Sequence, residues 1–508
     1  MKKAAISLMA LSIIMKIMGF FREIVLSYFY GASYVSDAYL ISLTIPGTIF
    51  AFVGTGIITS FIPMYNKIEK EEGLDSAETF TSNVINHVLI LCIIIVGFVM
   101  LYADFFVKIF ASGFEGKVLD LAILFTRITS MEIVFIAIIY IFTGYLNNKN
   151  KFLTPVLISL PFNISIIASI ILSTRLSLIA LPIGSVVATI LQFIFLLIFM
   201  IKQKFKHSIV LDIKNPKIKQ MLILSIPVII GVSVNQINVL VDRTIASQIT
   251  TGGISALNYS SRLNGFVQGI FISSIVTILY PKISRLAGDK KKIDEFKNVI
   301  ADSIIMVIIL VMPITIGAMF FSEEIIIFLF GRGAFDQLAV KLTSTTLFYY
   351  SIGMIGFGLR EILSRAFYSM HDTKTPMVNA SIGVLLNIFL NILFSYYIGL
   401  GGLALATSLS AIGTSILMFV SLRKKIGGFS IRKVIIIFIK ILTSSVLMGI
   451  IARFSYNNVI NYFSQNSSLL ISFLIGTIIY FIIIFFMKIE DIDEVFKDIK
   501  NKIGRDIE

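Results

Sequence analysis

Charged side chains interrupt several long apolar stretches of this chain, and the first stretch already carries Lys16, Arg22 and Glu23. A charge at the centre of a bilayer costs about 2.5–3.5 kcal/mol on insertion scales, so such residues usually face a polar cavity and mark a substrate or ion path. An arginine placed there can hold a phosphate group with two parallel hydrogen bonds. The first chemistry that the sequence indicates is therefore anion binding inside a membrane.

The candidates for this anion site are Lys16, Arg22 and Arg262. For a single arginine, a bridge between packed helices is the better explanation, whereas the set of three favours an anion site. Neighbours on a helix do not face each other, so Arg22 and Glu23 are not expected to pair, while Lys16 and Glu23 share a face. We therefore expect Arg22 to find its partner on another helix, in a lipid or in a substrate.

Other polar residues inside apolar stretches favour different roles. Asp242 together with Asn387 and Asn391, which lie four apart on one helix face, could supply oxygens to a small hard cation. Asparagine contacts that hold membrane helices together are the commoner explanation. Arginine and glutamate also recur in two further groups that are more typical of structural or gating pairs. These groups are Arg127 with Glu132, and Arg360 and Arg365 with Glu361.

The composition places these residues in a membrane protein. The chain has 508 residues, of which 57% are hydrophobic and 14% are charged, whereas a soluble domain has about 25% charged residues. A spanning helix needs about 20 mostly apolar residues. The sequence predicts fourteen spans, with both termini cytoplasmic. They cover roughly 4–28, 36–65, 83–110, 118–146, 153–173, 177–201, 221–248, 254–281, 298–321, 342–370, 375–398, 401–422, 434–453 and 467–487.

The net charge is +14, and the positions of the basic residues are explained by the membrane topology, not by a nucleic-acid partner. Most Lys and Arg residues outside the spans lie in the predicted cytoplasmic segments, as the positive-inside rule requires. The outward segments carry few basic residues, namely Lys117, Arg175, Arg332, Lys341 and Arg453. The basic excess could also contact anionic membrane lipids.

Cofactor chemistry finds little support in the sequence. One cysteine and three scattered histidines make an intrachain disulfide impossible and a zinc or thiol-redox site very improbable. No GxxxxGK[ST] motif is present, so ATP hydrolysis is not expected. The first span is followed by no small-residue cleavage site, and we expect it to be retained.

Weak internal repetition indicates two six-span lobes. Ala38 and Pro63 recur as Ala256 and Pro281 at one common offset, and a proline before the fifth span recurs before the eleventh. Repeats with an even number of spans are parallel, and such transporters bind substrate at the repeat interface. The predicted domains are an N-terminal lobe, a basic connector, a C-terminal lobe, two extra spans and a cytoplasmic tail with helical periodicity. They cover 1–201, 202–220, 221–425, 426–488 and 489–508.

The segment GFFREIVLSYFYGASYVSDAYLISLTIP (19–46) closely resembles the MurJ/MviN family of lipid II flippases, within the multidrug/oligosaccharidyl-lipid/polysaccharide exporter superfamily. Further similarity lies in VDRTIAS (241–247), GRGAFD (331–336) and RAFYSMHDTKTP (365–376). The resemblance implies an all-α polytopic fold of about 14 transmembrane helices, with two six-helix lobes around a central cavity and two C-terminal helices that form a groove for a lipid tail. It also implies a bacterial cytoplasmic membrane protein of peptidoglycan biosynthesis, and hence of cell-wall biogenesis and cell shape.

The resemblance also implies roles for single residues. Arg22 matches the arginine of the family's first span, Glu23 the acid after it, and Lys16 a position where some members have another arginine. Asp37 matches the acid that opens the second span, and Arg262 the arginine of the eighth. In the family the cavity arginines are held to bind the pyrophosphate. Some members bind sodium, and the matching positions are Asp242, Asn387, Asn391 and Thr407.

The expected activity is the movement of lipid II, an undecaprenyl-pyrophosphate-linked peptidoglycan precursor, from the inner to the outer leaflet by alternating access. We expect no catalytic residue and no cofactor other than sodium or another coupling ion. A monomer is expected, alone or beside the cell-wall synthesis machinery. The chain departs from the family pattern at 45–56 (IPGTIFAFVGTG), where many members carry two arginines, and at Ser261, where an acid can stand.

These departures keep three alternatives open. The first is a flippase for another lipid-linked polysaccharide precursor. The second is a cation-coupled drug exporter, which would need acids instead of arginines to dominate its cavity, because its cargo is usually cationic. The third is a membrane enzyme acting on lipid phosphates, which would need converging acid and base groups.

Overall fold

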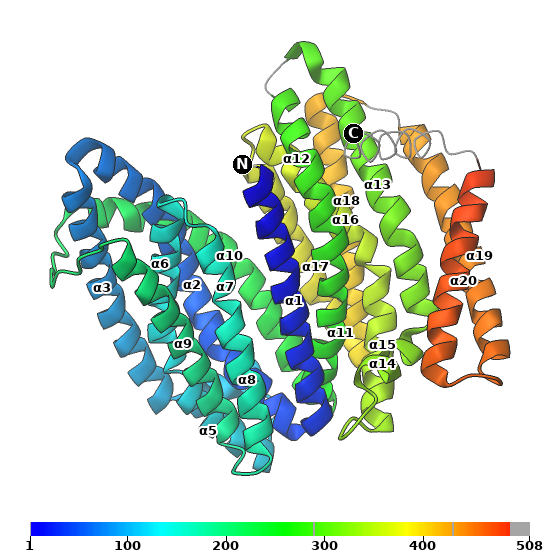
Figure 1. The fold of residues 1–508 in the computed structure, drawn as a ribbon, viewed down its shortest axis with the longest axis horizontal. Coiled ribbons are helices and arrows are strands. Elements are labelled where there is room, and N and C mark those ends of the chain that lie inside the picture. Colours follow the sequence, from blue (N-terminus) through cyan, green and yellow to red (C-terminus); the bar gives the residue numbers. More distant parts are fainter. Residues whose placement is uncertain (1, 288–289, 429–430, 488–508) are drawn as a thin grey trace. The chain divides into compact units, whose positions relative to one another are not determined.

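The described part of the chain is helical throughout. The computed structural model describes residues 2–287, 290–428 and 431–487, and these contain no β-strand (Figure 1). Among them, eight helices are long and apolar enough to cross a membrane, or twelve if each of four bent helix pairs is one span. The all-α polytopic class is confirmed, whereas the number of fourteen spans stays a prediction. The predicted tail 489–508 lies outside the described residues.

The helices form two compact units. The first comprises the chain up to Tyr259 together with Phe330–Ala339, and the second comprises Ser260–Leu329 and the chain from Val340 onward. The first unit contains α1 (Lys2–Tyr30), α2 (Tyr34–Glu72), α3 (Leu74–Leu101), α4 (Ala103–Phe110), α5 (Gly116–Thr129), α6 (Glu132–Asn148), α7 (Leu153–Leu157), α8 (Ser159–Ser173), α9 (Ala180–Lys202), α10 (Pro216–Ile249) and the first half of α11 (Gly253–Val267).

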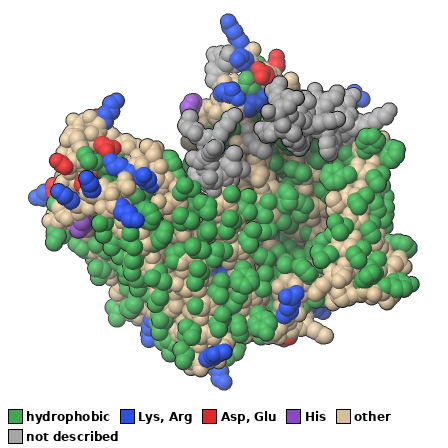
Figure 2. All heavy atoms as spheres, viewed as in Figure 1, with side chains coloured by type: hydrophobic (Ala, Val, Ile, Leu, Met, Phe, Trp, Pro, Cys, Tyr) green, Lys and Arg blue, Asp and Glu red, His purple; other side chains and the backbone are tan. Residues whose placement is uncertain are grey.

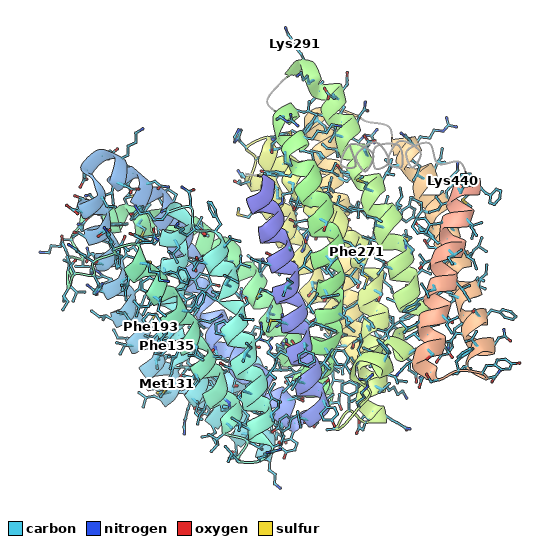
Figure 3. The ribbon with its side chains drawn as sticks, viewed as in Figure 1. Met131, Phe135, Phe193, Phe271, Lys291 and Lys440 are labelled. Carbon is cyan, nitrogen blue, oxygen red and sulfur yellow. The ribbon has the colours of Figure 1, made fainter. Side chains whose placement is uncertain are left out.

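The long helix α2 organises the first unit. It packs against α10, α5, α6 and α3, while α1 packs against α8 and α8 against α9. Phe61 and Tyr65 of α2 are fully buried in the apolar core that these helices share. Phe135 of α6 lies beside Phe193 of α9, with ring centroids 5.8 Å apart (Figure 3). An apolar core thus joins α2, α3, α6, α9 and α10.

Apart from Phe330 and residues 337–339, which belong to the first unit, the second unit contains the remaining helices. They are the second half of α11, the π-helical turn η1 (Gln268–Ile272), α12 (Ser273–Ala287), the 3-10 turn η2 (Lys290–Lys292), α13 (Ile293–Phe320), α14 (Ser322–Phe330), α15 (Gln337–Ile352), α16 (Met354–Ser369), α17 (Lys374–Ile398), α18 (Leu400–Ile426), α19 (Ile431–Val459) and α20 (Gln465–Phe486). Within this unit α17 pairs with α18 and α19 pairs with α20, and α13 joins α16 to α19. The hydroxyl of Tyr480 donates to the carbonyl oxygen of Ile309 at 2.6 Å, which ties α20 to α13.

The compact units do not divide the chain where its predicted repeats meet. The division into two lobes at the connector 202–220 stays a prediction, and within the compact units α10, which follows the connector, groups with the first unit. The reason is the extensive packing of α10 along α2. Ser225 of α10 donates to the carbonyl oxygen of Gly56 at 3.0 Å, and its hydroxyl lies 2.7 Å from that of Ser60. The duplication itself stays a prediction.

Some predicted spans are interrupted helices. The predicted span 118–146 is α5 and α6, which meet at an angle of 43°. At the bend the hydroxyl of Thr129 donates to the carbonyl oxygen of Ser42 on α2 at 2.7 Å, and that of Ser130 donates back to Arg127. The Ser42 carbonyl lies four residues before Pro46, which has no N–H to offer it, so the hydroxyl of Thr129 supplies the missing donor. The predicted span 254–281 is likewise α11 and α12 with the π-helical turn between them.

The surface has the pattern expected of membrane helices. On the face that Figure 2 shows, apolar side chains cover the middle of the helices, and most Lys and Arg side chains lie toward helix ends. Large apolar residues such as Ile94, Leu385 and Phe389 are more than 60% exposed. Lipid tails, not water, are the suitable surroundings for such residues.

Candidate functional site

Arg22 on α1 makes an ion pair with its own neighbour. Its Nη2 atom lies 2.7 Å from Oε1 of Glu23, which corrects the expectation that the two do not pair. The spacing rule describes where the Cβ atoms point, whereas the long arginine side chain bends back to reach the carboxylate. The guanidinium also lies over the ring of Phe162, 5.7 Å from its centroid. Glu23 thus supplies the countercharge that Arg22 needs in an apolar helix.

The carboxylate of Glu23 joins α1 to α11. Glu23 is 2% exposed, and its Oε2 atom accepts a hydrogen bond from Nδ2 of Asn258 at 3.0 Å. Oδ1 of Asn258 in turn accepts from Nη2 of Arg243 on α10 at 3.5 Å, and Nη1 of Arg243 donates to the carbonyl oxygen of Ile254 at 2.9 Å. A buried carboxylate is stable when its charge is paired and hydrogen-bonded. Removing one member of such a buried pair typically costs about 3–5 kcal/mol.

Asp37 on α2 holds the start of α11. It is 1% exposed, and Oδ2 accepts from the backbone N–H of Gly252 at 2.6 Å. Oδ1 accepts from the backbone N–H of Ser255 at 2.8 Å and from the hydroxyl of Ser255. Unpaired N–H groups and the helix dipole favour a carboxylate at a helix N-terminus. Both oxygens of Asp37 are thus engaged by α11, a geometry that favours a positioning role over contact with an anionic substrate.

A tight corner closes the end of α1. Gly31 has φ +60°, and a Cβ atom there would lie 2.3 Å from the carbonyl oxygen of Ala334. The N–H of Ala334 donates to the carbonyl oxygen of Tyr28 at 2.8 Å. The hydroxyl of Tyr259 donates to the carbonyl oxygen of Gly31 at 3.0 Å. The ring of Tyr259 also packs on Phe330 and Phe335. This corner fixes the helix that carries Arg22 and Glu23.

The other two predicted anion ligands are exposed. Lys16 lies on α1, before Arg22, and its side chain is exposed. Arg262 is exposed on α11, four residues after Asn258 and hence on the same side of that helix. Arg262 belongs to the second unit and Arg22 to the first. A common anion site formed by both therefore stays a prediction.

The two predicted structural groups have different outcomes. Arg365 and Glu361 form an ion pair at 2.8 Å on α16, as expected, while Arg360 lies over the ring of Phe357. Arg127 is exposed on α5, and buried Glu132 instead accepts a hydrogen bond from the hydroxyl of Ser185 at 2.5 Å. Arg127 and Glu132 are thus not a pair, because the bend between α5 and α6 separates them.

Three of the predicted cation ligands meet between α17 and α18. Nδ2 of Asn387 lies 3.3 Å from the hydroxyl oxygen of Thr407, and Asn391 donates to Oδ1 of Asn387 at 2.8 Å. These oxygens are of the type that hard cations prefer, yet the hydrogen bonds among them already explain the cluster as helix packing. Asp242 lies on α10 in the first unit. The described residues hold no cluster of three His, Cys, Asp or Glu suited to a metal.

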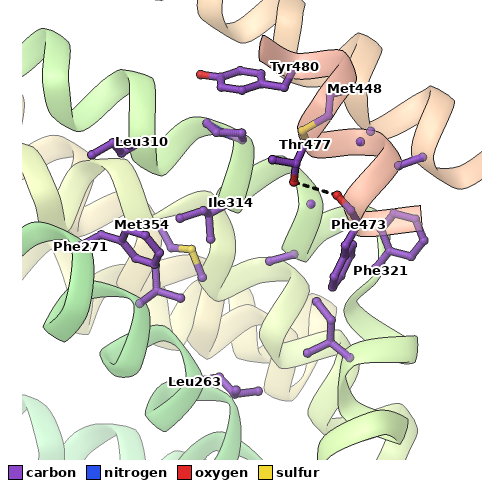
Figure 4. A pocket seen from close by; sticks show the side chains of 18 of the residues that line it. Leu263, Phe271, Leu310, Ile314, Phe321, Met354, Met448, Phe473, Thr477 and Tyr480 are labelled. Atoms are coloured by element: carbon purple, nitrogen blue, oxygen red, sulfur yellow. Dashed lines mark hydrogen bonds between the residues drawn. The ribbon is translucent and has the colours of Figure 1, made fainter. Parts of the chain in front are cut away.

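An apolar cavity of about 470 Å³ lies within the second unit (Figure 4). Leu310 and Ile314 of α13 face it from one side, and Met448 of α19 and Phe473 of α20 from the other. Gly317 opens onto it, because a Cβ atom there would meet nothing within 4 Å. The hydroxyl of Thr477, a polar group in the lining, is satisfied by the carbonyl oxygen of Phe473 at 2.7 Å. Such a lining suits a hydrocarbon chain.

Comparison with known proteins decides the family. Residues 26–474 match the family model described as "Lipid II flippase MurJ". The chain belongs to the MurJ family. It is 30% identical over 426 residues to a "Probable lipid II flippase MurJ" of Vibrio cholerae, a match that covers 80% of each chain. It is 31% identical over 471 residues to a "Lipid II flippase MurJ" of Thermosipho africanus, which covers 92% of each.

Solved structures agree with this assignment. A structure described as "Lipid II flippase MurJ, inward closed conformation" matches with a TM-score of 0.83 and 28% identity, covering 96% of this chain and 100% of the other. An inward-facing MATE family transporter matches with a TM-score of 0.68, 13% identity and coverage of 81% of this chain and 94% of the other. The second likeness concerns the fold alone. The chain is therefore an integral membrane protein of a transporter family.

The segments that resemble the MurJ family mostly build corners and helix ends. GRGAFD (331–336) forms the corner at Gly31, and its Asp336 accepts from the N–H of Ala339 at 2.8 Å at the start of α15. In RAFYSMHDTKTP, Asp372 accepts from the N–H and hydroxyl of Thr375 and pairs with Lys425. The hydrogen bond from Lys425, ahead of those from Thr375, lowers the pKa of Asp372 to about 2.

Sequence reasoning missed the partners of the acidic residues. Asn258 and Ser255 were not singled out, although they bind Glu23 and Asp37. A signal was present, because Ser255, Asn258 and Arg262 recur at helical spacing within the predicted span 254–281. Polar residues at that spacing in an apolar helix mark a face that contacts other polar groups.

Proposed function

We propose that this chain is a lipid II flippase, which moves the undecaprenyl-pyrophosphate-linked peptidoglycan precursor from the inner to the outer leaflet of the bacterial cytoplasmic membrane by alternating access. The observation that carries the proposal is the Arg22–Glu23 ion pair in the first span of a MurJ family chain. Both termini lie in the cytoplasm in this proposal, as the distribution of Lys and Arg favours. The reaction is transport, and no residue is assigned to covalent chemistry.

Arg22 is the proposed contact for the pyrophosphate. Its side chain is 20% exposed, and in the described part of the chain Nη2 is the one guanidinium nitrogen of Arg22 that makes a hydrogen bond. The remaining N–H groups keep the planar donor geometry that phosphate oxygens prefer. Lys16, which is exposed on the same helix, adds positive charge to the site. Glu23 and Asp37 act as positioning residues that hold α1 and α11.

The apolar cavity of the second unit is the proposed place for part of the polyprenyl tail. Its lining is almost entirely apolar, and it lies between α13 and the helices α19 and α20. A tail that stays in apolar surroundings avoids exposure to water at about 0.8 kcal/mol per CH₂ group. The headgroup and the tail therefore need different sites, and the chain offers one of each kind.

The membrane potential or an ion gradient would supply the drive. One charge that moves through 100 mV gains about 2.3 kcal/mol, and sodium or another ion could couple to transport. No nucleotide-binding motif is present in the sequence. The coupling ion is left open in this proposal, because the hydrogen bonds among Asn387, Asn391 and Thr407 account for that cluster.

A second candidate is a flippase for another lipid-linked polysaccharide precursor. It is favoured by the segment 45–56, which has no basic residue where many family members carry two arginines. Fewer positive charges would weaken the grip on a pyrophosphate with an acidic headgroup and would suit a less acidic cargo.

Complementation separates these candidates. A bacterial cell depleted of its own lipid II flippase is supplied with this chain, and growth and cell shape are recorded. The proposal expects rescue by the wild type, and by the control Gly97→Ala, since a Cβ atom at Gly97 of α3 would meet nothing within 4 Å. Failure of rescue by a well-expressed wild type, together with stronger binding of another polyprenyl-pyrophosphate glycan by the purified protein, would favour the second candidate.

A further inference from the structure

The connector between α9 and α10 contains a segment without helix or strand, 206–213, that is bound along one side by α3. Nδ2 of Asn83 donates to the carbonyl oxygen of Asp212 at 3.1 Å, and Oδ1 of Asn83 accepts from the N–H of the same residue at 3.0 Å. Nδ2 of Asn86 donates to the carbonyl oxygens of Ser208 and Val210 at 3.0 and 2.9 Å. Asn83 and Asn86 are both buried. Two side-chain amides of α3 thus satisfy four backbone groups of the segment.

The same segment exposes a row of large aliphatic side chains. Ile209, Leu211 and Ile213 alternate along it and are 91%, 55% and 73% exposed. Phe205, just before the segment, packs inward on Tyr145 with ring centroids 5.3 Å apart. Three exposed aliphatic side chains so close together are unusual on a surface that faces water.

Positive charge surrounds this apolar row. Exposed lysines precede and follow the segment and also occupy its first position. They are Lys202, Lys204, Lys206, Lys214 and Lys219. An apolar face bordered by lysines is the pattern of segments that lie in a membrane interface, with apolar groups in the acyl region and ammonium groups at anionic headgroups.

The backbone bonds determine the depth at which the segment can lie. A non-helical backbone is excluded from the hydrocarbon core unless its polar groups are satisfied. In 206–213 the groups that face α3 are satisfied by Asn83, Asn86 and the hydroxyl of Ser82, which accepts from the N–H of Ser208 at 3.2 Å. The segment begins beside the start of α3 at Leu74–Leu101, a helix apolar enough to cross a membrane. A position at the membrane interface suits the segment, because its backbone groups are satisfied on the side of α3 and because it lies beside the start of a helix that can cross the membrane.

We propose that the segment 206–213 is a membrane-interface anchor, in which Ile209, Leu211 and Ile213 insert among the lipids and the adjoining lysines bind anionic headgroups. The anchor fixes the ends of α9 and α10, the two helices that the connector joins, against the plane of the bilayer. This inference is independent of the cargo, because it concerns the membrane lipids themselves.

The test measures lipid contact at position 209 directly. In a Cys92→Ser background, Ile209→Cys is labelled with an environment-sensitive fluorophore, and the full chain is placed in nanodiscs that contain brominated lipids. Glu71→Cys on the exposed end of α2 is the matched control. We expect a shift to shorter wavelength and strong quenching at 209, with little quenching at 71. Equal and weak quenching at both positions would overturn the anchor. That result is also the one expected if a partner protein, and not lipid, normally covers Ile209, Leu211 and Ile213.

The charge dependence is tested in the same system. Brominated phosphatidylglycerol and brominated phosphatidylcholine are compared at equal total lipid, and we expect the anionic lipid to quench position 209 more strongly. The double variant Lys206→Gln, Lys214→Gln should lose this preference while the neutral lipid still quenches. A preference that the double variant leaves unchanged would overturn the assignment of these lysines to headgroups.

Discussion

Nη2 of Arg22 lies 2.7 Å from Oε1 of Glu23, so two successive residues of α1 neutralise each other inside an apolar helix. The pair is anchored on the acidic side, because Glu23 also accepts from Asn258 and is 2% exposed. The basic side is less enclosed, with 20% of the Arg22 side chain exposed. Glu23 is therefore held in place, whereas Arg22 keeps N–H donors that can bind a ligand.

The contact between Asp37 and α11 is predicted to stabilise the first unit. Asp37→Asn removes a charged acceptor from the N–H groups of Gly252 and Ser255 and should lower the free energy of unfolding by about 1.5–3 kcal/mol. Asp104→Asn, at an exposed acid on α4, is the control and should change it by less than about 0.5 kcal/mol. Thermal unfolding in detergent, followed by circular dichroism, measures both. Equal stability of the two variants would contradict the assigned role of Asp37.

Filling the apolar cavity should inhibit transport without loss of stability. Gly317→Leu places a side chain in the open space beside α13, and a leucine also favours the helix over glycine by up to about 1 kcal/mol. Growth rescue of flippase-depleted cells should fall, while the melting temperature stays equal or rises. Gly97→Leu on α3 is the control, and it should rescue normally. Normal rescue by well-expressed Gly317→Leu would show that the tail does not need this cavity.

The loop before α17 should show an acid-sensitive contact. The pKa of Asp372 is lowered to about 2 by Lys425 and Thr375, whereas an unfolded aspartate titrates near 3.9. A carboxyl whose pKa falls on folding stabilises the folded state above about pH 4, and this contribution disappears as the pH falls toward 2. Asp372→Asn should therefore unfold at a lower temperature than the wild type at pH 7, and the difference should shrink below pH 4.

Lys425→Gln provides the matched check on this loop. Lys425→Gln removes the ion-pair partner of Asp372. Its unfolding temperature should lie below that of the wild type at pH 7, and this difference should shrink at acid pH. Circular dichroism is again the suitable measurement, because the chain has no tryptophan. A gap that stays constant from pH 7 to pH 3 would contradict the role of Asp372.

Hydropathy predicted the helices well because each spanning helix must satisfy its own backbone hydrogen bonds. The predicted spans 177–201 and 467–487 correspond closely to α9 and α20. Interruptions were missed, such as the bend between α5 and α6, because they depend on contacts between helices, here from Thr129 to Ser42. The grouping of α10 with the first unit likewise depends on its packing along α2.

The sequence singled out charged residues of α1 and α2 as site candidates but did not indicate their hydrogen-bond partners. Arg22, Glu23 and Asp37 were recognised because a charge in an apolar stretch is costly. Asn258 and Ser255 have no such cost and were overlooked, although they determine where the acids point. The pairing of Arg22 with Glu23 depends on how a long side chain bends, which residue spacing does not determine.

The most direct test of the proposed function measures lipid II transport by variants at the Arg22–Glu23 pair. Arg22→Ala alone leaves the buried Glu23 carboxylate without its guanidinium countercharge and should also weaken folding. The double variant Arg22→Ala, Glu23→Gln removes both charges and keeps the hydrogen bond to Asn258, so it should fold more stably than Arg22→Ala.

Purified wild type and double variant are reconstituted in liposomes, and the appearance of lipid II headgroups in the opposite leaflet is followed over time. We predict that the wild type moves lipid II and that the well-folded double variant loses most of this activity, because the pyrophosphate has lost its arginine. Wild-type transport rates from the double variant would contradict the central claim that Arg22 binds the cargo.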